Sequence, residues 1–253
     1  MKPLFLTVVI ICIFSLTVSA ENDVTLLIAK GDSLFNLLDD NGALNQYVAA
    51  LDIDSMNYEA NWKASRAYTD VGETIEDDDE RAEFYLKGSK LARRAVNIDS
   101  TRAKGHLYLS IALGRVALDA GAKERIKLSK EIKKEVDLAI KYDPNDDAAY
   151  HVLGRWNRKL SNLSWIEKGF ADMFLGGVPE DASEENAVAA FKKAIELKPN
   201  HINHHLELGI TYEMMGLEEE AKQEFQICLD LPPSDSKDGK YKAQAKEYLE
   251  DLE

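Results

Sequence analysis

The sequence predicts an all-α protein built from repeated helix pairs. Apolar residues recur at helical spacing almost throughout, and no run of alternating apolar and polar residues is long enough to suggest a sheet. Phrases that would end a helix return five times: ALDIDSMN, AVNIDSTR, AIKYDPND, AIELKPNH and CLDLPPSD. We therefore expect a right-handed helical solenoid of about five helix pairs with a C-terminal capping helix, because stacked repeats bury one continuous core.

The first twenty residues have the layout of a secretory signal peptide. Lys2 supplies the positive end, an apolar stretch follows from Leu4 to Phe14, and Val18-Ser19-Ala20 ends in a small residue. We expect cleavage after Ala20 and a periplasmic or secreted product. An uncleaved membrane anchor is the alternative, but the apolar stretch is short for a span, which takes about 20 residues.

The charge and the cysteines limit the partners and the covalent chemistry. The net charge is −14, and this acidity argues against nucleic acid and against anionic membrane surfaces as main partners. Cys228 is the one cysteine that would remain after cleavage, so the mature chain has no intrachain disulfide. We interpret Cys228 as a small packing residue.

The clearest repeat covers residues 202–235, INHHLELGITYEMMGLEEEAKQEFQICLDLPPSD. Its small residues allow two antiparallel helices to cross closely, its rings fill the space beside them, and its proline ends the second helix. These positions are Gly209, Tyr212, Ala221, Phe225 and Pro233. Their types and spacing resemble the tetratricopeptide repeat.

The same phase can be followed toward the N-terminus. The repeats are expected at about 24–57, 58–102, 103–146, 147–201 and 202–235, with a cap over 236–253. The further signature residues are Gly31, Ala43, Tyr47, Tyr68, Gly154, Phe191 and Pro199. The second, third and fourth units exceed the standard length of about 34 residues. We expect each excess to lie between the paired helices, where it does not interrupt the stack.

The fourth unit carries a more specific signature. YHVLGRW at 150–156 is followed by LSWIEKGF at 163–170 and by a helix of the pattern A-x-x-x-F-x-x-A from Ala187. This combination resembles the regulator-of-microtubule-dynamics family, which implies a helical repeat fold and an adaptor role at proteins or membranes. Microtubules are acidic, so the charge of this chain opposes that contact. The acidic charge and the export signal together favour an exported, bacterial form of the family.

The tetratricopeptide resemblance implies a ligand groove lined by the first helix of each pair. The expected groove residues are Trp62, Arg66, Arg115, His151, Arg155 and Arg158. The planar guanidinium suits carboxylates and phosphates, so the groove would hold an acidic or C-terminal peptide segment, or a phosphate-bearing headgroup. The alternative is that these arginines pair with neighbouring acids and only hold the helices together. The acids considered are Glu124, Glu131 and Glu167.

Three other features of the sequence are candidate sites: an apolar stripe, a pair of histidines and an acidic run. An apolar stripe over 163–175 is expected to pack on the solenoid, with a lid or a membrane contact as alternatives. His201 and His205 are one turn apart, but no carboxylate or thiol has matching spacing, so we expect no metal and no cofactor. The acidic run from Asp77 to Glu80 is expected in a solvated loop.

No catalytic motif is present, so the sequence predicts a binding protein and not an enzyme. The favoured function is a scaffold of the cell envelope that holds a protein or peptide partner in the arginine-lined groove. The alternative is a lipid- or membrane-associated carrier that uses the apolar groove and the 163–175 amphipathic insert. A hydrolase with an unrecognised site is the least favoured of the three.

Overall fold

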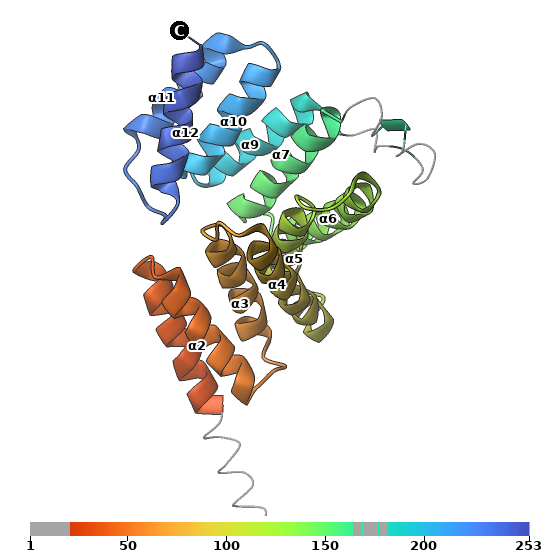
Figure 1. Ribbon diagram of the computed structural model, residues 1–253, viewed down its shortest axis with the longest axis vertical. Helices are drawn as coiled ribbons and strands as arrows, with labels where there is room; N and C mark the ends of the chain where they lie inside the picture. Colours follow the sequence, from red (N-terminus) through yellow and green to blue (C-terminus); the bar gives the residue numbers. More distant parts are fainter. Residues whose placement is uncertain (1–20, 164–167, 170–176, 178–181, 253) are drawn as a thin grey trace, which may run out of the picture. The chain divides into compact units, whose positions relative to one another are not determined.

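The computed structural model describes residues 21–163, 168–169, 177 and 182–252. In these ranges every regular element is an α-helix, and the helices follow one another as antiparallel pairs (Figure 1). This confirms the predicted all-α, tetratricopeptide-like fold class. The expected signal peptide, residues 1–20, and most of the 163–175 stripe lie outside the described residues.

The chain forms two compact units, one ending at Ser100 and one beginning at Thr101. The first contains a helix over 21–36 and three further helices packed in sequence. They are α2 (Asp40–Ile53), α3 (Tyr58–Gly72) and α4 (Asp78–Ile98). Its core is formed by small, aliphatic and aromatic side chains from the first three of these helices, including Val24, Ile28 and Tyr47.

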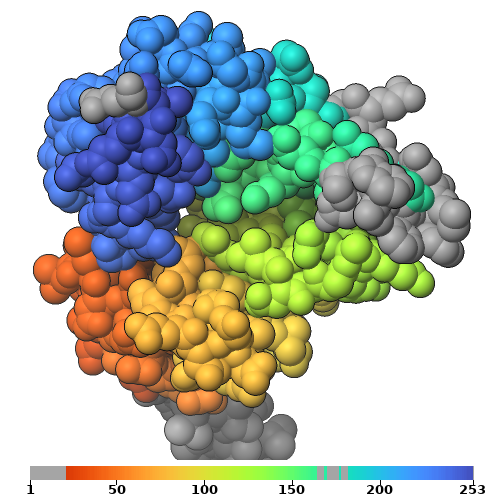
Figure 2. All heavy atoms as spheres, turned by 45° about the horizontal axis from the view of Figure 1, so that its top comes forward, coloured from red at the N-terminus to blue at the C-terminus, as the bar shows by residue number. Residues whose placement is uncertain are grey.

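The second unit contains the remaining helix pairs and a final single helix. They are α5 (Ala103–Val116), α6 (Ala122–Tyr142), α7 (Asp147–Ser161), α9 (Glu184–Leu197), α10 (Ile202–Met214), α11 (Glu218–Asp230) and α12 (Asp238–Asp251). Within this unit α10 packs on α9, α11 and α12 and also contacts α7. Figure 2 shows the blue side chains of α10–α12 gathered against the teal and green ones of α9 and α7. None of the helices in the described ranges is both long and apolar enough for a membrane span.

Acidic and small polar side chains begin five of these helices. Asp39, Asn57, Asp77, Asp146 and Ser183 each accept a hydrogen bond from a backbone N–H of the first turn. Residues 77–80 are exposed to solvent as expected, but the expectation of a loop was wrong, because Asp77 caps α4 and the next three residues form its first turn. Carboxylates are favoured there because they offset the positive end of the helix dipole.

Three glycines let the two helices of a pair approach closely. A Cβ atom added to Gly31, Gly154 or Gly209 would lie within 3.0 Å of a ring on the paired helix. The rings belong to Tyr47, Phe191 and Phe225 respectively, and all three are fully buried. The three glycines therefore have equivalent surroundings in the first, fourth and fifth pairs.

The second and third pairs solve the same packing problem with different residues. At the corresponding positions they carry Ser65 with Ala92 and Ser110 with Val136, and all four are buried. In these two pairs the first helix has serine in place of glycine, and the second helix has alanine or valine in place of an aromatic residue, so the total volume at the contact is shared differently. The second helices of these pairs, α4 and α6, each have 21 residues, so the extra length of these units extends a helix.

Replacing Gly154 by alanine should destabilise the protein by about 1–2 kcal/mol. The added methyl group overlaps the Phe191 ring, which cannot move in a filled core, and this outweighs the gain in helix propensity of about 1 kcal/mol. The control is Gly114→Ala on α5, where a Cβ would have no neighbour within 4 Å. This variant should be neutral or slightly stabilising. Equal urea midpoints for the two variants would contradict the packing argument.

Candidate functional site

The Gly154-Arg155-Trp156 sequence attaches α7 to three neighbouring helices. Gly154 faces Phe191 on α9, and Trp156 is buried with its indole N–H donating to the Ser129 carbonyl on α6 at 2.8 Å. Arg155 extends toward α10, where its Nη1 lies 3.4 Å from Oε1 of Glu207. Successive residues on a helix point about 100° apart, so three adjacent residues can face three different neighbours.

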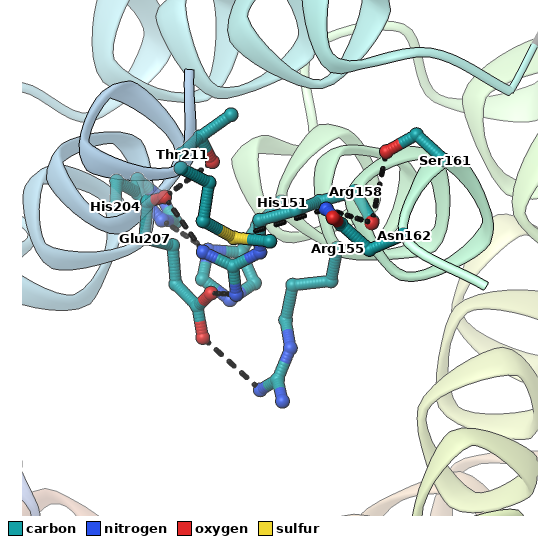
Figure 3. Close-up of polar contacts among 9 residues, drawn as sticks. His151, Arg155, Arg158, Ser161, Asn162, His204, Glu207 and Thr211 are labelled. Atoms are coloured by element: carbon teal, nitrogen blue, oxygen red, sulfur yellow. Dashed lines mark hydrogen bonds and ion pairs between the residues drawn. The ribbon is translucent and has the colours of Figure 1, made fainter. Parts of the chain in front are cut away.

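A buried ion pair joins α7 to α10. Arg158 donates to both the carbonyl and the carboxylate of Glu207, and Figure 3 shows Arg155 approaching the same carboxylate. The side chains of Arg158 and Glu207 are 7% and 9% exposed, whereas that of Arg155 is 31% exposed. Arg158 therefore holds two repeats together, and of the two arginines Arg155 is the more accessible to a ligand.

The two arginines keep the Glu207 carboxylate ionised. Burial by itself would raise its pKa. The attraction of Arg155 and Arg158, together with the hydrogen bond from Arg158, outweighs burial and holds the pKa of Glu207 below its usual value of 4.5. This carboxylate is thus an ion across the neutral pH range.

Among the described residues, several cations gather around this pair. Lys159 is exposed at its end of α7, and its pKa is lowered by burial of part of the side chain and by repulsion from Arg158, Arg155 and Arg125. Only Glu207 opposes this among the principal influences on Lys159. Four cations thus act around one carboxylate in a chain of net charge −14. We call Arg125, Arg155, Arg158 and Lys159 the cationic cluster.

His151, expected in the groove, is instead buried between helices. Its ring lies edge-on to Phe191, and its Nδ1 is 2.9 Å from Nδ1 of His204. Burial, and then the nearby His204 and Arg155, lower the pKa of His151 well below 6.5. His151 is therefore neutral at pH 7 and faces α10.

The pair His201 and His205, considered from the sequence as a zinc pair, does not converge. His205 turns to Glu224 on α11 and to the Pro199 carbonyl, at 2.7 and 2.8 Å. His201 instead stacks on His204, with ring centroids 4.1 Å apart. Asp147, at the start of α7, accepts from Nε2 of His204 at 2.9 Å.

The groove residues expected at 62 and 66 lie on α3 in the first unit. The Arg66 guanidinium sits 3.5 Å from the Phe35 ring and donates to the Tyr47 hydroxyl at 3.1 Å. Trp62 is half-buried, 5.7 Å from the same guanidinium. Beside them, Lys63 is buried and pairs with Asp32 at 2.5 Å and with Glu59 at 2.8 Å.

The structure thus brings Arg155, Arg158 and His151 together on α7 in the second unit, and Trp62 with Arg66 in the first. Arg115 lies in the last turn of α5 and is half-buried. Of the acids proposed as arginine partners, Glu124 pairs instead with Lys127 on its own helix, while the partner of Arg155 and Arg158 is Glu207.

Sequence reasoning missed Glu207, Asp147 and Lys63. A signal for Glu207 was available, since it is the one acidic residue in the apolar-rich first turns of the fifth repeat, INHHLELG. A carboxylate buried in such a segment requires a cationic partner. Lys63 and Asp147 have other charged residues close to them in the sequence. They therefore do not stand out as single charges in an apolar segment, as Glu207 does.

Replacing Glu207 by glutamine should destabilise the protein by about 3 kcal/mol, because Arg158 would remain buried without a counter-charge. Glu196→Gln is the control, since its ion pair with Lys193 is on the surface and contributes at most about 0.5 kcal/mol. Both are measured by urea denaturation at pH 7.

The pH dependence of the same variants gives a second readout. The folded-state pKa of Glu207 is depressed, so its contribution is present above 4.5 and is lost as the pH falls through the lower folded-state value. Glu207→Gln should remove this part of the acid sensitivity. An unchanged loss of stability below pH 4.5 would show that the pair is not responsible.

Comparison with known proteins gives one family. The family model described as regulator of microtubule dynamics protein 1-3 matches residues 27–253. Regulator of microtubule dynamics protein 3 of Rattus norvegicus is 30% identical over 193 residues, covering 76% of this chain and 40% of the relative. The corresponding protein 2 of Homo sapiens is 28% identical over 192 residues, covering 76% and 47%. The chain therefore spans less than half the length of these relatives.

Solved structures support the same fold. A thermophilic tetratricopeptide protein of Thermus thermophilus superimposes with a TM-score of 0.67 at 18% identity, covering 89% of this chain and 98% of that one. Pseudomonas aeruginosa pilF gives a TM-score of 0.55 at 13% identity, covering 92% of each chain. At such identities the likeness concerns the fold alone. The family match over nearly the whole described chain, with the tetratricopeptide fold, shows that this chain belongs to the regulator of microtubule dynamics family.

Proposed function

We propose that this protein is a non-catalytic scaffold that binds an acidic peptide segment of a protein partner at the cationic cluster of α6 and α7. The tetratricopeptide fold supports the coarser part, since it is a scaffold for protein–protein binding. The observation that carries the finer part is that Arg125, Arg155, Arg158 and Lys159 gather near Glu207, with Arg155 and Lys159 accessible on α7.

Accessibility divides the roles within the cluster. Arg158 is buried on Glu207, so it holds the surface in place and does not itself meet a ligand. Arg155 is partly exposed, and Lys159 is exposed one turn further along α7. Arg125, exposed on α6, adds a third cation from the neighbouring helix. Their repulsion from one another, which lowers the pKa of Lys159, would be relieved by a carboxylate ligand.

The alternative of a lipid carrier depended on the apolar groove and on the apolar stripe at 163–175, and most of that stripe lies outside the described residues.

The acidic-ligand proposal is tested with a fluorescein-labelled, glutamate-rich peptide of about ten residues that ends in a free carboxylate. The double variant Arg155→Gln, Lys159→Gln should weaken its binding by at least about 100-fold, since it removes two hydrogen bonds to charged groups that contribute about 1.5 kcal/mol or more each. Fluorescence anisotropy measures the Kd. Raising the salt from about 50 to about 200 mM should also weaken binding.

The matched control is Lys192→Gln, Lys193→Gln on α9, which changes the net charge equally within the same unit. It should bind as the unmodified chain does. Equal weakening by both double variants would reduce the effect to overall charge, and a peptide that does not bind the unmodified chain would remove the proposal.

The proposal also places the scaffold in the cell envelope, on the basis of residues 1–20 alone. The protein isolated from its native cells should then begin at Glu21, as measured by intact-mass analysis. A native product that retains Met1 to Ala20 in the cytoplasm would contradict the location and leave the binding proposal standing.

A further inference from the structure

The starts of α7 and α10 bring together two imidazoles and a carboxylate from distant parts of the sequence. One potential ligand atom each from Asp147, His201 and His204 lies within 4.8 Å of the others. Asp147 is the first residue of α7, while His201 caps α10 and His204 lies in its first turn. The carboxylate of Asp147 is 2.9 Å from Nε2 of His204. Ligands bonded to zinc at about 2.0–2.1 Å in a tetrahedron are about 3.3 Å apart, so small side-chain rotations suffice.

An unsatisfied buried nitrogen points to the same place. Nδ1 of His201 is buried and makes no hydrogen bond with any residue in the described ranges. Buried polar side-chain atoms nearly always have a partner, so this lone pair or N–H needs an explanation. The stacking of His201 on His204 holds both rings side by side at the helix start, close to Asp147.

His151 supplies the support that a ligating histidine ordinarily has. Its Nδ1 faces Nδ1 of His204 at 2.9 Å, so one of these two nitrogens carries a proton and the other accepts it. If Nε2 of His204 binds a metal, its Nδ1 must carry the proton and donate to His151. Metal-bound histidines typically donate their second N–H to an acceptor, which fixes the tautomer and the ring orientation.

We propose that Asp147, His201 and His204 form a binding site for Zn²⁺ that joins the fourth and fifth repeats. Two imidazoles and one carboxylate suit zinc, whereas Ca²⁺ and Mg²⁺ take oxygen ligands throughout. Three protein ligands leave the fourth position to water or to a group from a partner. Asp235 adds negative charge near His201, and Lys198 opposes it.

The site would strengthen the same joint as the Arg158–Glu207 pair. That pair lies further along α7 and α10, whereas Asp147, His201 and His204 lie at the starts of these two helices. A metal ion there would fix the second contact point between the two helices. Zinc would thereby stabilise the joint between α7 and α10, which carries the cationic cluster.

The test is titration of the full chain, without a histidine tag, by Zn²⁺ in a calorimeter and by Co²⁺ with visible absorption. One equivalent of each metal should bind, and Co²⁺ should give the intense d–d bands of four-coordination. Asp147→Asn and His201→Ala should each weaken the binding of Zn²⁺ by more than about 100-fold. Loss of a residue that only supports a ligand weakens metal binding by at most about that factor. His151→Asn should weaken it by about 10- to 100-fold.

The matched control is His205→Gln, which alters a histidine of the same helix outside the cluster and should leave the Kd for Zn²⁺ unchanged. Circular dichroism confirms that each variant is folded, and His201 serves as the main test because it is only partly buried. Absence of saturable binding by the unmodified chain would overturn the proposal. Unchanged binding by folded His201→Ala would overturn it as well.

Discussion

The close contact between a residue without a side chain and a buried ring is the constraint on which the helix pairs depend. At Gly31, Gly154 and Gly209 the paired helix comes so near that a methyl group would overlap a ring. Because each ring is fully buried, it fixes both the separation of the two helices and the depth at which they cross. In the fourth and fifth pairs this contact sets how α7 and α10 lie against their paired helices, α9 and α11.

Polar contacts then help to hold one helix pair against the next. Arg158 and Glu207 lie at a joint between repeats where an apolar contact would also have served, and buried ion pairs are seldom the most stable choice. Their benefit is directional, since the guanidinium binds both the carbonyl and the carboxylate of one residue. The Gly154-Arg155-Trp156 sequence therefore marks a joint between repeats as well as a helix.

The same joint concentrates the features that suggest binding. Arg155 and Lys159 lie beside the carboxylate that holds Arg158, and the first turns of the same two helices bring histidines close to Asp147. Both arrangements arise because side chains of α7 and α10 must meet between repeats. A scaffold of this kind can thus combine rigidity and recognition on one pair of helices, with the charged ends facing solvent and the apolar parts in the core.

The sequence by itself determined the helix pairs, their capping helix and the family, because small and ring-bearing side chains recur at a spacing that only nested helices satisfy. It also located Arg155, Arg158 and His151 on one helix. Only the tertiary structure decided that Glu207 is the partner of these arginines, and that His204 and Asp147, not His205, accompany His201. Periodicity specifies which face of a helix is buried, but the identity of the residue opposite depends on the crossing of two helices far apart in the chain.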